Sequence, residues 1–112
     1  QITYNDISRA TDTLHHDSLR RAHTKILLVE DRAFFAYAHA RMLGSIGAHV
    51  THIWNQYDVL SIDFTKYDAI VISESPPAIN PMLIIHLISL IPQEKRPAIF
   101  VVVDKANIHK YI

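Results

Sequence analysis

The chain has 112 residues, which is enough for one domain with a single hydrophobic core. Its eleven basic and eleven acidic side chains cancel, so the strong positive charge typical of proteins that bind nucleic acids or anionic membranes is absent. The sequence contains no cysteine, which excludes disulfides and thiolate chemistry, and it has no apolar run as long as a membrane span. We therefore expect a cytoplasmic domain that binds neither nucleic acid nor membrane.

The first segment, Gln1 to Thr24, is mostly polar and has too few apolar side chains to form a core. We expect a linker here, either disordered or partly helical between Asp12 and Arg21. The chain begins at Gln1 and stops at Ile112 soon after an apolar segment, so we expect a piece of a longer protein. The folded domain is then expected to span 25–112.

From Lys25 the pattern changes. Residues 26–29 form a short, continuously apolar run, as expected for a strand that is buried on both faces of a parallel sheet. Apolar side chains then recur at every fourth position, which predicts a helix with one core-facing stripe. Gly47 is placed to end this helix in the left-handed conformation. The stripe consists of Phe34, Ala38, Met42 and Ile46.

A second strand is predicted from about His49 to Trp54, followed by a helical turn near Tyr57 to Ile62. A third strand of the buried kind runs from Tyr67 to Ser73. Pro76 and Pro77 prevent its continuation, because proline cannot donate a hydrogen bond to a neighbouring strand.

Asn80 is placed to cap a helix that has Pro81 at its first position. This helix is expected from Met82 to Ile91, and a fourth strand from Ala98 to Val103. Strands that alternate with helices at this spacing predict an α/β fold with a doubly wound parallel sheet. In such sheets the functional residues lie at the carboxyl ends of the strands.

Polar residues follow three of these predicted carboxyl ends. Glu30 and Asp31 follow the first strand, and two adjacent carboxylates suit Mg²⁺, which prefers oxygen ligands and takes few of them from protein. Ser73 ends the third strand and is followed by Glu74 and Ser75. The fourth strand ends in the sequence Val-Asp-Lys, residues 103–105.

In order and spacing, these segments resemble the receiver domain of two-component response regulators. The resemblance covers Lys25 to about Ala106 and implies a flavodoxin-like sheet with the strand order 2-1-3-4, which lacks the family's fifth strand and its helix within this chain. It rests on Lys-Ile-Leu-Leu-Val-Glu-Asp (25–31), Met42-Leu43, Gly47, Tyr-Asp-Ala-Ile-Val-Ile (67–72) and Pro77.

The same resemblance implies that the phosphorylation chemistry has been lost. In the family, an aspartate at the end of the third strand accepts a phosphoryl group from a histidine kinase, beside an acidic pair that holds Mg²⁺. This chain has Ser73 at that position, and a serine without a nearby base is a poor nucleophile. The family's hydroxyl residue at the end of strand four falls on Val102 or Val103, and its lysine has no counterpart because Lys105 lies too early. We therefore expect a degenerate pseudo-receiver that is not an enzyme.

Other interpretations of these residues remain open. Glu30 and Asp31 either bind Mg²⁺ weakly or are solvated, in which case Asp31 caps the following helix. Ser73 and Ser75 either serve the geometry of the loop or are phosphorylated by a serine kinase. No two of the eight histidines have good spacing for metal ligands, so weak Mg²⁺ is the only cofactor we consider.

The helix from Met82 to Ile91 carries no charged residue. A surface helix ordinarily has charges on its outer face, so we expect this face either to contact a protein partner or to be buried by the linker. The fourth strand is expected to have an open edge, which favours self-association. The predicted core-facing residues are Leu83, Ile84, Leu87, Ile88 and Ile91, and the outer face holds Met82, Ile85, His86 and Ser89.

The function that we expect is a regulatory, protein-interaction module in two-component signal transduction, within a hybrid sensor histidine kinase. One alternative is a genuine receiver in which Asp68 or Asp104 accepts the phosphoryl group. Another is a small metal- or nucleotide-binding module. Nucleotide binding is disfavoured because the chain has only two glycines and no glycine-rich loop follows a strand.

Overall fold

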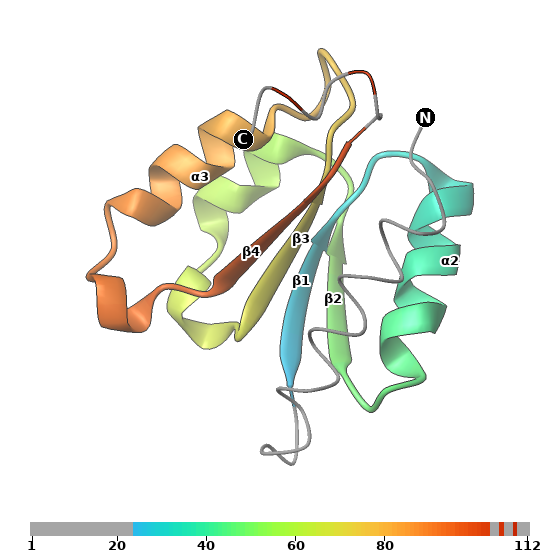
Figure 1. Ribbon diagram of the computed structural model, residues 1–112, viewed down its shortest axis with the longest axis horizontal. Helices are drawn as coiled ribbons and strands as arrows, with labels where there is room; N and C mark the ends of the chain where they lie inside the picture. Colours follow the sequence, from blue (N-terminus) through green and yellow to red (C-terminus); the bar gives the residue numbers. More distant parts are fainter. Residues whose placement is uncertain (1–23, 104–105, 107–108, 110–112) are drawn as a thin grey trace.

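The computed structural model describes residues 24–103, 106 and 109, and the expected linker therefore lies almost entirely outside the described residues. Within them, four parallel strands form one sheet in the order β2-β1-β3-β4 (Figure 1). This confirms the predicted α/β, flavodoxin-like fold class and strand order. The strands are β1 (Lys25–Val29), β2 (His49–Ile53), β3 (Ala69–Ser73) and β4 (Ala98–Val102).

One helix covers each face of the sheet. Helix α2 (Ala33–Gly44) lies on one side and α3 (Pro81–Ser89) on the other (Figure 1). The two central strands, β1 and β3, have almost no exposed surface after their first residues, as continuous apolar runs in a parallel sheet require. Short 3₁₀ helices complete the described fold: η1 (Gln56–Ser61), η2 (Phe64–Lys66) and η3 (Gln93–Lys95).

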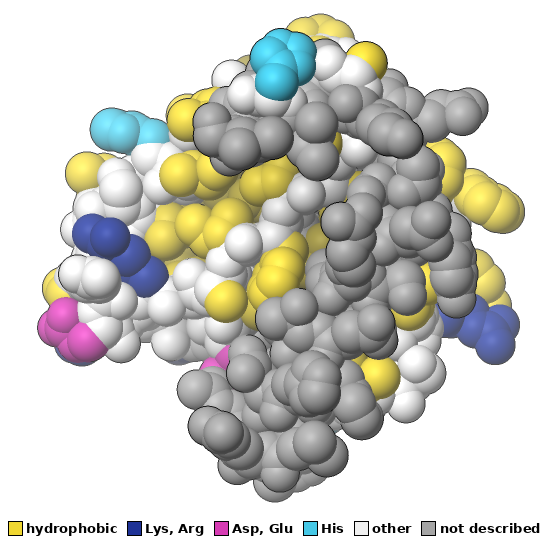
Figure 2. Space-filling model, in the orientation of Figure 1, with side chains coloured by type: hydrophobic (Ala, Val, Ile, Leu, Met, Phe, Trp, Pro, Cys, Tyr) yellow, Lys and Arg dark blue, Asp and Glu magenta, His cyan; other side chains and the backbone are white. Residues whose placement is uncertain are grey.

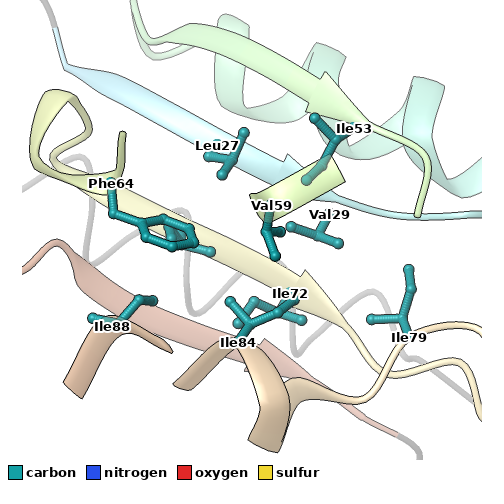
Figure 3. Packing of buried hydrophobic residues seen from close by; sticks show 10 residues of the cluster. Leu27, Val29, Ile53, Val59, Phe64, Ile72, Ile79, Ile84 and Ile88 are labelled. Carbon is teal, nitrogen blue, oxygen red and sulfur yellow. The ribbon is translucent and has the colours of Figure 1, made fainter. Parts of the chain in front are cut away.

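The larger core cluster lies between the sheet and α3. Side chains from β1, β2 and β3 meet those of α3, η1 and η2 there (Figure 3). This packing explains why η1, the predicted helical turn, is apolar at Val59. The buried members are Leu27, Val29, Ile53, Val59, Phe64, Ile70, Ile72, Ile79, Ile84 and Ile88.

The predicted core stripe of α2 was partly wrong. Met42 and Ile46 do pack against the second core cluster, but Phe34 is 79% exposed. The buried line of the helix runs instead through Ala36, His39 and Leu43, a spacing of three and four residues. A four-residue step drifts around a helix with 3.6 residues per turn, so a stripe chosen by that step alone leaves the sheet at one end.

Both helix ends follow the expected local chemistry. The side chain of Asn80 accepts a hydrogen bond from the backbone N–H of Met82, and Pro81 is the first residue of α3. Gly47 has a positive φ of 86° in the turn after α2, a conformation that favours glycine.

Leu83, which we expected in the core, is 38% exposed, because Ile84 and Ile88 are the residues of α3 that face the sheet.

Candidate functional site

The candidate site lies at the carboxyl edge of the sheet. Val29 pairs with Ile72, and Ser73 pairs with Val102, so the residues that follow β1 and those that end β3 and β4 are brought to one edge. The backbone N–H of Glu74 extends the pairing by donating to the carbonyl of Val102 at 2.9 Å. The prediction that Glu30, Ser73 and Val103 lie at the same, carboxyl edge of the sheet is therefore confirmed.

The Glu30 carboxylate is completely buried and is held by Arg32. It accepts three hydrogen bonds from that residue: from the backbone N–H at 3.1 Å, from Nε at 3.1 Å and from Nη2 at 3.2 Å. Such a two-pronged guanidinium–carboxylate pair is among the stronger side-chain interactions in proteins. The expectation that Glu30 is solvated is therefore wrong.

His39 is a second buried group beside this pair, and the sequence analysis did not identify it. Its Nδ1 lies 3.8 Å from Oε1 of Glu30 and has no hydrogen-bond partner among the described residues. Desolvation by burial lowers the pKa of His39; Glu30 opposes this effect and Arg32 adds to it. The neutral imidazole is therefore favoured. The sequence does contain a signal for its burial, because His39 lies three residues after Ala36 and four before Leu43, on the face of α2 that packs against the sheet.

Phe35 completes the wall of this cluster. The guanidinium carbon of Arg32 lies 4.6 Å from the centre of the Phe35 ring, a cation–π geometry. The centres of the Phe35 and His39 rings are 6.0 Å apart. Arg32 is thus fixed by an aromatic ring as well as by the buried carboxylate.

Asp31 does not cap α2, contrary to one interpretation of the sequence. The residue at the N-cap position is Arg32, and no side chain bonds the first turn there. Oδ2 of Asp31 instead accepts a hydrogen bond from Oγ of Ser75 at 3.0 Å, which joins the loop after β1 to the loop after β3. Its Oδ1 is buried without a hydrogen-bond partner and lies 3.8 Å from Nε of Arg32.

Ser73 is completely buried, and its hydroxyl forms no hydrogen bond within the described residues. No described base is therefore in place to take its proton, which leaves a weak nucleophile. Val102 and Val103, at the end of the neighbouring strand, are both buried and offer only hydrocarbon to this edge. This corner of the site can exclude water, but it presents no activated group.

A metal site is not formed by the described side chains. Residues 24–103, 106 and 109 include no group of three or more histidines and carboxylates that could hold a metal ion. The acidic pair itself is divided, because Glu30 bonds to Arg32 while Asp31 bonds to Ser75. Weak Mg²⁺ binding by the pair remains a prediction.

The candidate interaction face on α3 is accessible. Met82 is 52% exposed, His86 and Ser89 are exposed, and Ile85 is half-buried. Hydrophobic side chains gather over the region of α3 and β4 in the view of Figure 2. The face contains no charged side chain, as the sequence predicted.

The outer edge of β4 is not paired with any described strand. The N–H of Ala98 donates to the carbonyl of Asp68, and the carbonyl of Val102 accepts from Glu74, so these two residues face β3. Because successive backbone groups alternate along a strand, the N–H and C=O groups of Ile99 and Val101 point away from β3. Both side chains are half-buried and apolar.

Comparison of the chain with protein-family models, with curated proteins and with solved structures gave no match. None of the helices in the described part of the chain has the length and apolar character needed to cross a membrane.

Proposed function

We propose that this chain is a receiver-like regulatory domain that accepts no phosphoryl group and acts through protein contacts. The observation that carries the proposal is Ser73, a buried hydroxyl without a base at the strand end where a receiver has its phospho-accepting aspartate. The setting we propose is cytoplasmic two-component signalling, as a part of a hybrid sensor histidine kinase.

The surroundings of Ser73 support this proposal. A phosphoryl group brings negative charge, which a receiver balances with a metal ion. Here the neighbouring carboxylate of Glu30 is already neutralised by Arg32, and Val102 and Val103 have no hydroxyl to bind the transferred group. Each of these substitutions weakens the stabilisation that phosphoryl transfer requires.

Incubation with acetyl phosphate and Mg²⁺ followed by intact-mass spectrometry tests the proposal. We expect no phosphoryl adduct under conditions that label an active receiver assayed in parallel. A hydroxylamine-labile adduct on an aspartate would contradict the proposal and favour the alternative of a genuine receiver with an atypical acceptor. An adduct on Ser73 that resists hydroxylamine would also contradict it.

The partner surface that we propose comprises the outer face of α3 and the edge of β4, and its occupant is a second copy of this chain. Antiparallel pairing of two β4 strands about Phe100 would set Ile99 opposite Val101 of the other copy. These are the two residues whose backbone groups point outward, and neither carries a charge that would oppose pairing.

Sedimentation of wild type and two variants tests this interface. Val101→Pro removes an outward N–H without removing a bond to β3, and Ile85→Lys places a charge on the outer face of α3. We expect the wild type to associate and both variants to shift toward monomer. A matched control, Lys95→Ala, changes an exposed side chain before β4 and should associate like wild type. A wild-type monomer at high concentration would contradict the interface.

A further inference from the structure

The face of the sheet on the α2 side is wider than α2 itself. Among the described helices only α2 packs on this face, where it contacts β2 and lies apart from β4 (Figure 1). The outer two of four strands are about 14 Å apart, whereas a helix with its side chains is about 10–12 Å wide. All four strands contribute apolar side chains to this face, among them Ile26, Val50, Val71 and Phe100.

The side chains of β3 and β4 on this face are nevertheless buried. Ala69 is 0% exposed, and Val71 and Val102 are each 1% exposed. Such burial is usual for parallel strands, which are apolar on both faces and need a cover on each. A single chain achieves this burial, so no second copy is required to cover the face.

The stretch of chain best placed to provide this cover is residues 1–23. It runs directly into Thr24, a buried residue at the amino end of β1 whose carbonyl accepts a hydrogen bond from the N–H of His49 at 2.8 Å. A segment tethered to the sheet in this way is present at an effective concentration in the millimolar range or above. The other end of the chain is less suitable, since Ala106 and His109 are both exposed beyond the carboxyl end of β4.

The same segment has the sequence pattern of an amphipathic helix with a narrow apolar face. Ile7, Ala10 and Leu14 recur at intervals of three and four residues. Leu19 lies about 140° around such a helix from Leu14, on its polar side. A helix over residues 7–18 would be about 18 Å long, close to the length of roughly 17 Å expected for a five-residue strand.

We propose that residues 7–18 form a helix that covers β3 and β4 on the α2 side of the sheet. Leu14, near the middle of this helix, then lies against Val71, the middle residue of β3. The chain returns to Thr24 at the amino end of β1, so the helix runs antiparallel to the strands and Ile7 lies near Val102 at the carboxyl edge. The outer face of α3 and the edge of β4 stay free, so this contact does not depend on the function proposed above.

Methyl NOE spectra of the full 112-residue chain test the contact directly. We expect cross-peaks from Leu14 to Val71 and from Ile7 to Val102, and none from Leu19 to the sheet. Filtered spectra of mixed labelled and unlabelled chains should lack these cross-peaks, because the contact lies within one chain. Cross-peaks in the mixture would assign the cover to a second copy and would overturn the proposal, as would the absence of any cross-peak from Leu14 or Ile7 to the second core cluster.

Two matched substitutions measure what the contact contributes to stability. At a fixed protein concentration, Leu14→Ala should lower the urea midpoint by at least about 0.5 M, because it removes a buried side chain. Leu19→Ala is the same change on the polar side of the helix and should leave the midpoint within about 0.2 M of wild type. Equal midpoints for the two variants would overturn the proposal.

Discussion

Replacing Arg32 with alanine should destabilise the domain strongly, although the residue lies in a loop. The substitution removes both guanidinium hydrogen bonds to Glu30 and leaves a fully buried carboxylate with only the backbone N–H of residue 32 as donor. An uncompensated buried charge is costly because water cannot solvate it.

The structure sets the expected magnitude. Breaking a fully buried ion pair costs about 3–5 kcal/mol. The side chain of Arg32 is 35% exposed, and one of the three hydrogen bonds survives the substitution, so the loss should be smaller. We expect the free energy of unfolding to fall by about 2–3 kcal/mol, which includes the lost contact with Phe35.

Urea denaturation followed by circular dichroism measures this loss. The matched control is Arg41→Ala, which removes an exposed arginine of α2 that also contacts an aromatic ring and should cost about 0.5 kcal/mol or less. Glu30→Gln in the Arg32→Ala background should cost less than Glu30→Gln alone, because the two side chains act as one unit. If Arg32→Ala cost no more than Arg41→Ala, the pair of Arg32 with the buried Glu30 would not contribute to the stability of the fold.

Three further predictions concern the same edge of the sheet. Mg²⁺ should bind wild type with a Kd weaker than about a millimolar, because Arg32 already occupies the carboxylate of Glu30. Amide NMR shifts at Glu30 and Asp31 measure this affinity, and tighter saturable binding would contradict the prediction. Burial lowers the pKa of His39, so the unfolded chain takes up a proton at a higher pH than the folded chain does. The contribution of His39 to stability should be complete above the unfolded pKa of about 6.5 and should fall as the pH drops below it. The variant His39→Leu should flatten this pH dependence of the free energy of unfolding, measured by urea titrations at several pH values. The variant Ser73→Asp should still not be labelled by acetyl phosphate. Its melting temperature should be lower than that of wild type, because the substitution buries a second carboxylate near Glu30. Labelling of this variant would show that the site lacks only a nucleophile.

The sheet was predictable because its signal is local and redundant. Each central strand is a continuous apolar run, and a polar or proline-containing segment follows each of them. Helix α3 was equally well marked by Asn80 and Pro81. The orientation of α2 was less predictable, because its sequence is apolar on more than one side and only contact with the sheet selects Ala36, His39 and Leu43 over Phe34.

The candidate site was predictable in position but not in bonding. The strand ends fixed which edge Glu30, Asp31 and Ser73 share. Whether a carboxylate faces solvent or turns inward depends on rotamers and on neighbours from other elements, such as His39 of α2 and Ser75 after β3. Sequence spacing contains no such information, so the burial of Glu30 and the role of Asp31 were both misjudged.

The position of Arg32 only two residues after Glu30 has a consequence for how the domain responds to its ionic surroundings. A cation tethered to the same short loop is present at an effective concentration set by the chain, and short tethers give values in the millimolar range or above. This counter-ion is supplied whenever the loop is folded, regardless of how much divalent metal the solution contains. A chelator that would empty a metal-dependent acidic site should therefore leave the charge balance around Glu30 as it is.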